Sequence, residues 1–193
     1  MSLFGFGRKK PPSAAERLAS GRWQCAKCDE WHSWPFDIAA IVPDPWRGER
    51  VFEPNGALRL DGDFLSEDFC VMGGEYFMVR AVLPIPVNGV EGDFFFGCWT
   101  TLSRANFDIY TAGFDSGEYA DMGPWTGWLM NRPADFIEGK DPLPIWVEPQ
   151  PNRQRPHLWV RDDDEPLAVA QSEGISPERM LEIFAYYGHG VEG

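Results

Sequence analysis

The densest β-strand pattern of the chain lies in residues 68–102, which read DFCVMGGEYFMVRAVLPIPVNGVEGDFFFGCWTTL. Apolar residues fill Asp68–Met72 and Glu75–Leu83, and the two glycines between these runs accept the positive φ of a tight hairpin loop. After a second turn, Asp93–Leu102 has the pattern of a strand that is buried on both faces at its start. We predict that the three segments are adjacent antiparallel strands at the centre of a sheet.

Helices and further strands are predicted around this sheet. Ser103 is a candidate N-cap for a short helix over Arg104–Thr111, and Ser176 begins a C-terminal helix with an apolar face at helical spacing. Two more strands are predicted over Pro142–Val147 and His157–Arg161. The predicted fold class is α+β, with a central antiparallel sheet, a C-terminal helix packed on it and an N-terminal Cys-containing knuckle.

The chain has 193 residues, of which 44% are hydrophobic and 24% charged, as expected for one globular domain. We predict a flexible tail, with at most a loosely docked helix, over residues 1–22 and a single domain over residues 23–193. The sequence contains no apolar run of about 20 residues that would cross a membrane and no apolar stretch after its first basic residues. Four cysteines do not suggest a disulfide scaffold, so we expect a cytoplasmic protein with reduced thiols.

The net charge of −13 excludes one class of partner and favours another. Binding to a nucleic-acid backbone needs Lys and Arg to displace counterions, so a nucleic-acid partner is not expected. An acidic surface keeps a protein soluble, and it attracts basic proteins at long range. A solvated surface is the favoured interpretation of this charge, and a basic protein is the partner that it would fit.

The stretch Trp23–Pro35 reads WQCAKCDEWHSWP and resembles part of a zinc site. Cys25 and Cys28 have the spacing of a thiolate pair in a tight turn, where both sulfurs can face one ion. Each Zn–S bond is about 2.3 Å long, so such a turn must be fixed. His32 follows closely and can supply a nitrogen. The expected metal is Zn²⁺.

A fourth ligand must come from far along the chain. The candidates are His157, His189, Cys70 and Cys98. The two cysteines lie inside apolar strand patterns, which is typical of small buried core residues. Neither histidine has a diagnostic spacing; the predicted ligand set takes His189.

Two other interpretations of the Cys-x-x-Cys pair stay open. The first is a metal-free turn with two unpaired thiols. The second is a redox dithiol, which usually stands at a helix N-terminus that lowers the thiol pKa. Here Asp29 and Glu30 follow directly and would raise that pKa unless Lys27 offsets them. Redox chemistry is the least favoured of the three.

A ligand pocket is the second candidate site. It is predicted around Trp125 and Trp128, with Arg80 and Arg155 as charged partners. Tryptophans in a sheet protein belong to the core more often than to a pocket. Arg80 is the more unusual feature, because an arginine on a central strand needs a carboxylate partner when it is buried.

The order of several short motifs resembles the bacterial domain of unknown function called DUF2199. The motifs are CxxCxxxH near the start, then YFMVR, PIPV, FFGCWTTLS, GWL, RPHL and LAxxQxxGI. The likeness covers about Trp23 to His189. Asp29 stands where the family favours glycine, and Cys98 where it favours an aliphatic residue. The resemblance implies a stand-alone cytoplasmic bacterial protein with a metal knuckle, and it implies no established activity.

Three functions fit these observations. The first is a binding or regulatory module with structural zinc, because no nucleophile–base motif accompanies the cysteines. The second is a metal-assisted hydrolase with Glu30 or Asp29 as base, although the sequence lacks the Gly-x-Ser-x-Gly, P-loop and His-Glu-x-x-His patterns. The third is an acidic neutralising partner of a basic toxin or nuclease, which rests on charge alone.

Overall fold

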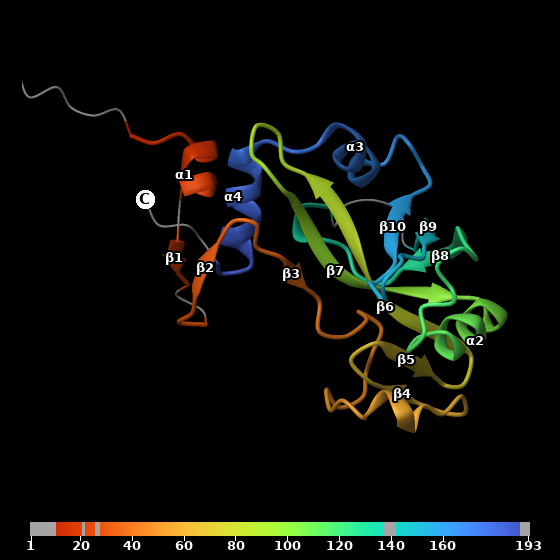
Figure 1. Cartoon of the computed structure of the whole chain (residues 1–193). Helices are drawn as coiled ribbons and strands as arrows, with labels where there is room; N and C mark the ends of the chain where they lie inside the picture. The colour runs from red at the N-terminus through yellow and green to blue at the C-terminus, as the bar shows by residue number, and fades with distance from the viewer. Residues whose placement is uncertain (1–10, 21, 26–27, 137–141, 190–193) are drawn as a thin grey trace, which may run out of the picture.

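A computed structural model of the chain describes residues 11–20, 22–25, 28–136 and 142–189. It contains a small two-stranded sheet, an eight-stranded sheet and helices at both ends (Figure 1). The elements, in order, are α1 (Ala14–Ser20), β1 (Arg22–Gln24), β2 (Trp31–Ser33), β3 (Ile38–Ala39), η1 (Asn55–Ala57), β4 (Phe64–Leu65), β5 (Phe69–Met72), β6 (Tyr76–Pro86), β7 (Asp93–Leu102), α2 (Arg104–Ala112), β8 (Trp125–Leu129), η2 (Ala134–Phe136), β9 (Leu143–Glu148), β10 (His157–Val160), α3 (Pro166–Glu173) and α4 (Pro177–Tyr186).

The long hairpin of β6 and β7 is the centre of the larger sheet. The two strands pair antiparallel from Phe77↔Leu102 to Pro86↔Asp93. Strand β5 pairs antiparallel with the first part of β6. The prediction of three adjacent antiparallel strands in this part of the chain is therefore confirmed.

The sheet as a whole is mixed and curved, which corrects the predicted antiparallel sheet. Strand β10 joins β6 in parallel at Val82, and β3 joins β7 in parallel. Because β7 also pairs with β8 at Thr100, the order β6-β7-β8-β9-β10 returns to β6 and forms a barrel-like sheet. The parallel contacts join segments that are distant in the sequence, and a local residue pattern carries no information about such pairs.

The barrel interior holds the main hydrophobic core. Side chains alternate along a strand, so the odd positions of β6 and the even positions of β7 point inward. On the opposite face of these two strands, a second cluster buries Leu65, Cys70, Met78 and Trp99. The buried interior side chains of β6 to β10 include Val79, Ala81, Leu83, Ile85, Phe94, Phe96, Cys98, Trp125, Leu129, Leu143, Ile145, Val147 and Leu158.

Helix α3 closes the barrel where β10 and β6 run side by side. The Gln171 side chain lies buried between the two strands. Its Oε1 accepts a hydrogen bond from the Val160 N–H at 2.9 Å, and its Nε2 donates to the Leu158 carbonyl at 2.7 Å and the Pro84 carbonyl at 3.3 Å. One amide therefore satisfies backbone groups of both strands that the single-residue parallel contact leaves without partners.

A buried ion pair fixes the same helix to the chain that follows β8. Arg132 Nη1 lies 2.8 Å from Glu165 Oε1, and the two side chains are only 7% and 9% exposed. Glu165 is the N-cap residue of α3. Such a pair is costly to break, because the remaining charge stays buried without its partner.

The N-terminal and C-terminal elements pack together beside the barrel. In Figure 1, α1 lies against α4, and β1 and β2 stand next to them. Leu18 of α1 is fully buried, and Phe184 of α4 contacts the ring of Phe94 at 6.1 Å between centroids. Part of the predicted tail thus forms a helix; residues 1–10 and 21 lie outside the described part of the chain. The predicted C-terminal helix is α4, whose N-cap is Ser176.

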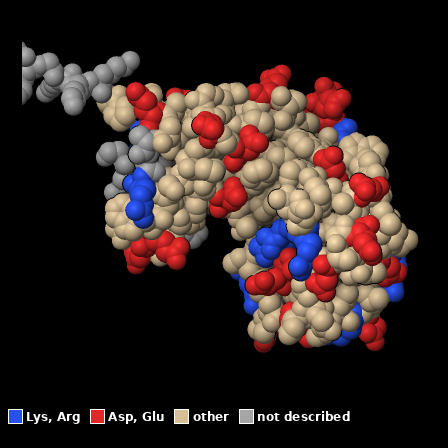
Figure 2. Space-filling model, in the orientation of Figure 1, with Lys and Arg blue, Asp and Glu red and all other residues tan. Residues whose placement is uncertain are grey.

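Charge is unevenly spread over the surface. Figure 2 shows acidic side chains scattered over the visible face, and basic side chains gathered most densely beside a notch between the terminal elements and the rest. Within the described residues, no helix has both the length and the apolar character needed to cross a bilayer.

Barrel closure at β7 and β8 can be tested at Gly127. A Cβ atom at this position would lie 2.3 Å from the Thr101 carbonyl oxygen of β7. We expect Gly127→Ala to lower the free energy of unfolding by about 2 kcal/mol, because a backbone atom must move. Urea denaturation of the wild-type protein and the variant measures this difference in the free energy of unfolding.

The matched control is Gly56→Ala. A Cβ there meets no atom within 4 Å, so stability should change by less than about 0.5 kcal/mol. Equal effects of the two substitutions would contradict the close approach of β8 to β7.

Candidate metal centre

The loop between β1 and β2 positions the two cysteines. Three antiparallel pairs join the strands, from Arg22↔Ser33 to Gln24↔Trp31. Beyond them, the Cys25 N–H donates to the Glu30 carbonyl at 2.8 Å, and the Asp29 N–H donates to the Cys25 carbonyl at 2.9 Å. These bonds fix the backbone on both sides of the loop, while residues 26 and 27, with Lys27, lie outside the described part of the chain.

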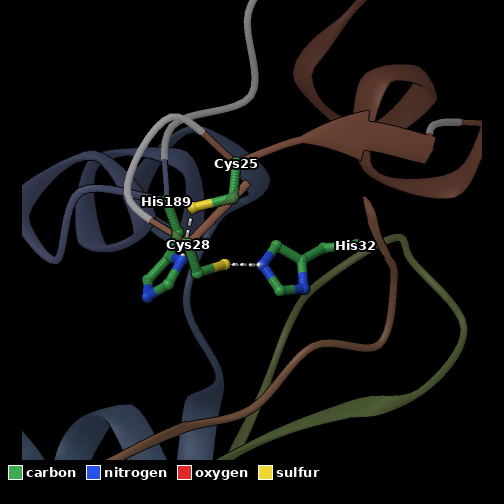
Figure 3. A group of neighbouring side chains, drawn as sticks. All are labelled: Cys25, Cys28, His32 and His189. Carbon is green, nitrogen blue, oxygen red and sulfur yellow. Dashed lines mark hydrogen bonds between the residues drawn. The ribbon is translucent and has the colours of Figure 1, made fainter. Parts of the chain in front are cut away.

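Four side chains from two distant parts of the chain converge at this loop. The ligand atoms of Cys25, Cys28, His32 and His189 all lie within 4.8 Å of one another. In Figure 3, Cys25 Sγ faces His189 Nδ1 at 2.9 Å, and Cys28 Sγ faces His32 Nε2 at 3.1 Å. Tetrahedral zinc would place such donors about 3.3–3.8 Å apart, given its bond lengths to sulfur and nitrogen. Small side-chain movements therefore suffice to surround one ion.

Aromatic rings and backbone groups hold the histidines in place. The ring of Phe36 lies 3.9 Å from that of His32 and 5.1 Å from that of His189, between centroids. The Trp23 indole N–H donates to the His189 carbonyl at 3.1 Å, which fixes the backbone that follows α4. Cys25 is fully buried, and Cys28 is exposed. The group therefore has an apolar wall on one side and solvent on the other.

The two sulfurs influence each other. The pKa of the Cys28 thiol is above its ordinary value: a backbone hydrogen bond from Glu30 favours the thiolate, but desolvation and the neighbouring Cys25 act in the opposite direction and outweigh it. A divalent cation between the sulfurs would reverse this, because it stabilises both thiolates.

The other candidates for a fourth ligand lie elsewhere. His157 begins β10, pairs with Val82, and has a pKa that burial lowers. Cys70 and Cys98 are fully buried in the two core clusters. Burial raises the pKa of Cys70 to about 12 and that of Cys98 further still. The structure thus brings His189 to the predicted half-site and keeps the other three away.

The residues predicted to line a ligand pocket do not form one group. Trp125 points into the barrel and is buried, whereas Trp128 points outward. Arg155 makes a half-exposed ion pair with Asp68 at 3.3 Å. Arg80 is close enough to Arg155 for repulsion to lower its pKa, although burial is the larger cause.

Arg80 is only partly buried, so the requirement of a carboxylate partner for a buried arginine does not apply to it, and none lies within ion-pair distance among the described residues. Its Nη2 donates to the Ala40 carbonyl at 2.7 Å, and its guanidinium lies 5.6 Å from the centroid of the Trp99 ring. Because Arg80 is only partly buried, a carbonyl and an aromatic face are enough to stabilise its charge.

The comparison with protein families identifies the chain. The sequence model of the family described as "Uncharacterized protein conserved in bacteria (DUF2199)" matches residues 24–175. The chain belongs to the DUF2199 family. A search of curated proteins and a search of solved structures found no match. The resemblance inferred from the motifs is therefore confirmed; the family match includes Cys25, Cys28 and His32 and stops before His189.

Two DUF2199 positions that the motifs single out have local structural explanations. Asp29, where the resemblance implies a glycine, has a φ of 57°, in the left-handed region that glycine adopts most readily. Gly174, in the motif LAxxQxxGI, has a φ of 76°, and a Cβ there would lie 2.7 Å from Asn88 Oδ1. The next residue, Ile175, donates its N–H to the Pro86 carbonyl at 2.8 Å. This motif therefore attaches α3 to the end of β6.

Thiol labelling tests this placement of the cysteines. In native protein treated with EDTA, Ellman's reagent should modify the exposed Cys28 first and Cys25 more slowly, and reach Cys70 and Cys98 only after unfolding. Cys28→Ser should remove the fast phase. Labelling of all four thiols at one rate in the native protein would contradict the described burial.

Proposed function

We propose that this DUF2199 protein is a binding module whose fold is completed by a structural Zn²⁺ bound to Cys25, Cys28, His32 and His189. The observation that carries the proposal is the convergence of four donors from the β1–β2 hairpin and from the end of α4. Two thiolates with two imidazoles form a donor set typical of structural zinc.

The number of protein donors favours a structural role over catalysis. Four side-chain donors fill a tetrahedral shell and leave no position for water, whereas catalytic zinc keeps one open. A hydrolase would also need a base near the ion. Glu30 and Asp29 are exposed residues of the hairpin loop, and the described structure gives neither carboxylate a hydrogen-bond or ion-pair partner that would orient it. We therefore place the metal-assisted hydrolase second.

The metal would join two parts of the chain that are distant in the sequence. Strands β1 and β2 pair only with each other among the described residues. Their attachment to α4 depends on aromatic contacts, such as Trp23 with Phe184 at 5.6 Å, and on the Cys/His group itself. Zinc bound here contributes folding free energy directly, because the unfolded chain has no such site. A cytoplasmic location would keep the sulfurs reduced for binding.

Metal analysis and chelation test the proposal. Protein purified without added metal should contain one equivalent of zinc per chain by elemental analysis. Removing the ion with a chelator should lower the melting temperature by about 10 °C, because a ligand that binds only the folded state stabilises it. Co²⁺ in place of zinc should give the sulfur charge-transfer and d–d absorption bands of a tetrahedral thiolate site.

A pair of histidine variants supplies the control. His189→Ala removes one donor and should weaken zinc binding at least about 100-fold. His157→Ala removes a histidine that lies outside the group and should leave the stoichiometry at one. Protein without zinc, or a melting temperature that chelation does not change, would refute the structural metal.

A further inference from the structure

Three tryptophans are exposed on the outer face of the barrel, on three neighbouring strands. Trp128, Trp146 and Trp159 are 46%, 40% and 36% exposed. They lie on the adjacent strands β8, β9 and β10, and Trp159 pairs directly with Trp146. Strand alternation points all three away from the core, since their neighbours Leu129, Ile145 and Leu158 are buried inside. Only Trp128 was singled out by the sequence analysis.

A groove of about 390 Å³ runs beside this aromatic face. Tyr76, Trp128 and Pro144 contribute rings to its lining, and Thr101 and Thr126 contribute hydroxyl groups. Two of the lining side chains, Tyr76 of β6 and Trp128 of β8, are 56% and 46% exposed, so the groove presents aromatic rings to solvent. Grooves lined by aromatic rings with a few polar groups are typical of recognition sites.

The aromatic face offers hydrogen-bond donors that the described residues leave without an acceptor. The indole N–H groups of Trp128 and Trp146 donate to no described residue, whereas that of Trp159 donates to Glu148 at 2.8 Å. The guanidinium of Arg161, which also lines the groove, lies 4.5 Å from the centroid of the Trp146 ring. A partner with free carbonyl groups would therefore find donors here.

Acidic side chains lie near this face. Glu75 lines the groove, Glu148 accepts a hydrogen bond from the Trp159 indole, and Asp162 and Asp163 come after Arg161, the first residue beyond β10. Arg161 and Arg104 are basic residues among them, and the guanidinium of each lies over an aromatic ring, Trp146 and Phe77 respectively. With the net charge of −13, the surrounding field attracts cations.

We infer that the exposed tryptophan face and its groove bind a basic, proline-rich segment of another protein. A polyproline II segment makes no internal hydrogen bonds, so its carbonyls are free to accept from indole N–H groups. Its proline rings pack between aromatic side chains, and its low entropy cost favours binding in such grooves. Flanking Arg or Lys residues complement the acidic rim. The inference rests on the binding role proposed above but not on zinc, because the face belongs to β8–β10 and not to the β1–β2 hairpin.

Fluorescence polarisation with a labelled peptide, Arg-Pro-Pro-Leu-Pro-Pro-Arg, tests the inference on the full chain. We expect saturable binding that weakens at least about tenfold when alanine replaces the prolines or glutamate replaces the arginines. Trp128→Ala should weaken binding at least about tenfold, as a central aromatic contact does. Trp31→Ala is the matched control, because Trp31 is 58% exposed on β2, and it should change the affinity less than about twofold.

Three results would overturn the inference. These are the absence of saturable binding, equal binding of the alanine peptide, and unchanged affinity in Trp128→Ala. Maltohexaose serves as the neutral competitor: if it binds and the peptide does not, the face is a carbohydrate site. Zinc content is measured in the same samples, so loss of the metal and loss of peptide binding are separate outcomes.

Discussion

The pairing of β6 with β7 is the constraint on which the rest of the fold depends. Each of these strands is longer than the neighbours on its outer edge, so each edge serves two partners. On β6, β5 occupies the first part and β10 joins at Val82; on β7, β3 and β8 share the edge in the same way. The barrel closes because β10, which pairs with β6, and β8, which pairs with β7, both pair with β9. Beside the single parallel residue pair of β10 and β6, the Gln171 side chain hydrogen-bonds the backbone groups of Val160 and Leu158.

The local parts of this fold follow from the sequence, and the closure does not. A two-glycine loop and alternating apolar residues identify the central strands, since both signals lie within a few residues. Barrel closure depends instead on contacts such as Thr100↔Leu129 and Val82↔His157, between segments whose patterns say nothing about each other. Helix α3 was missed because hydropathy does not distinguish its two faces: the polar Gln171 is buried beside Leu167, Ala168 and Ala170, whereas the apolar Val169 is 40% exposed.

In the candidate sites, too, the sequence predicts what is local and does not predict contacts between distant segments. The spacing of Cys25, Cys28 and His32 indicates a half-site by itself, but only the packing of α4 brings His189 to it. Arg80 is only partly buried on its central strand, and a backbone carbonyl and the Trp99 ring contact its guanidinium. The outward tryptophans were not separable from core tryptophans by composition. Strand register decides which face a residue occupies, and register was the unknown quantity.

The separation of the four proposed metal ligands along the chain has a consequence for biosynthesis. Cys25 and His189 are 164 positions apart, and the whole barrel lies between them. During translation the first three donors leave the ribosome before any barrel strand, and the last follows all of them. A nascent chain would therefore present only part of the ligand set of the proposed zinc site, and the complete set would form after the barrel has been synthesised. Tightly held metal would then mark chains whose folding has finished.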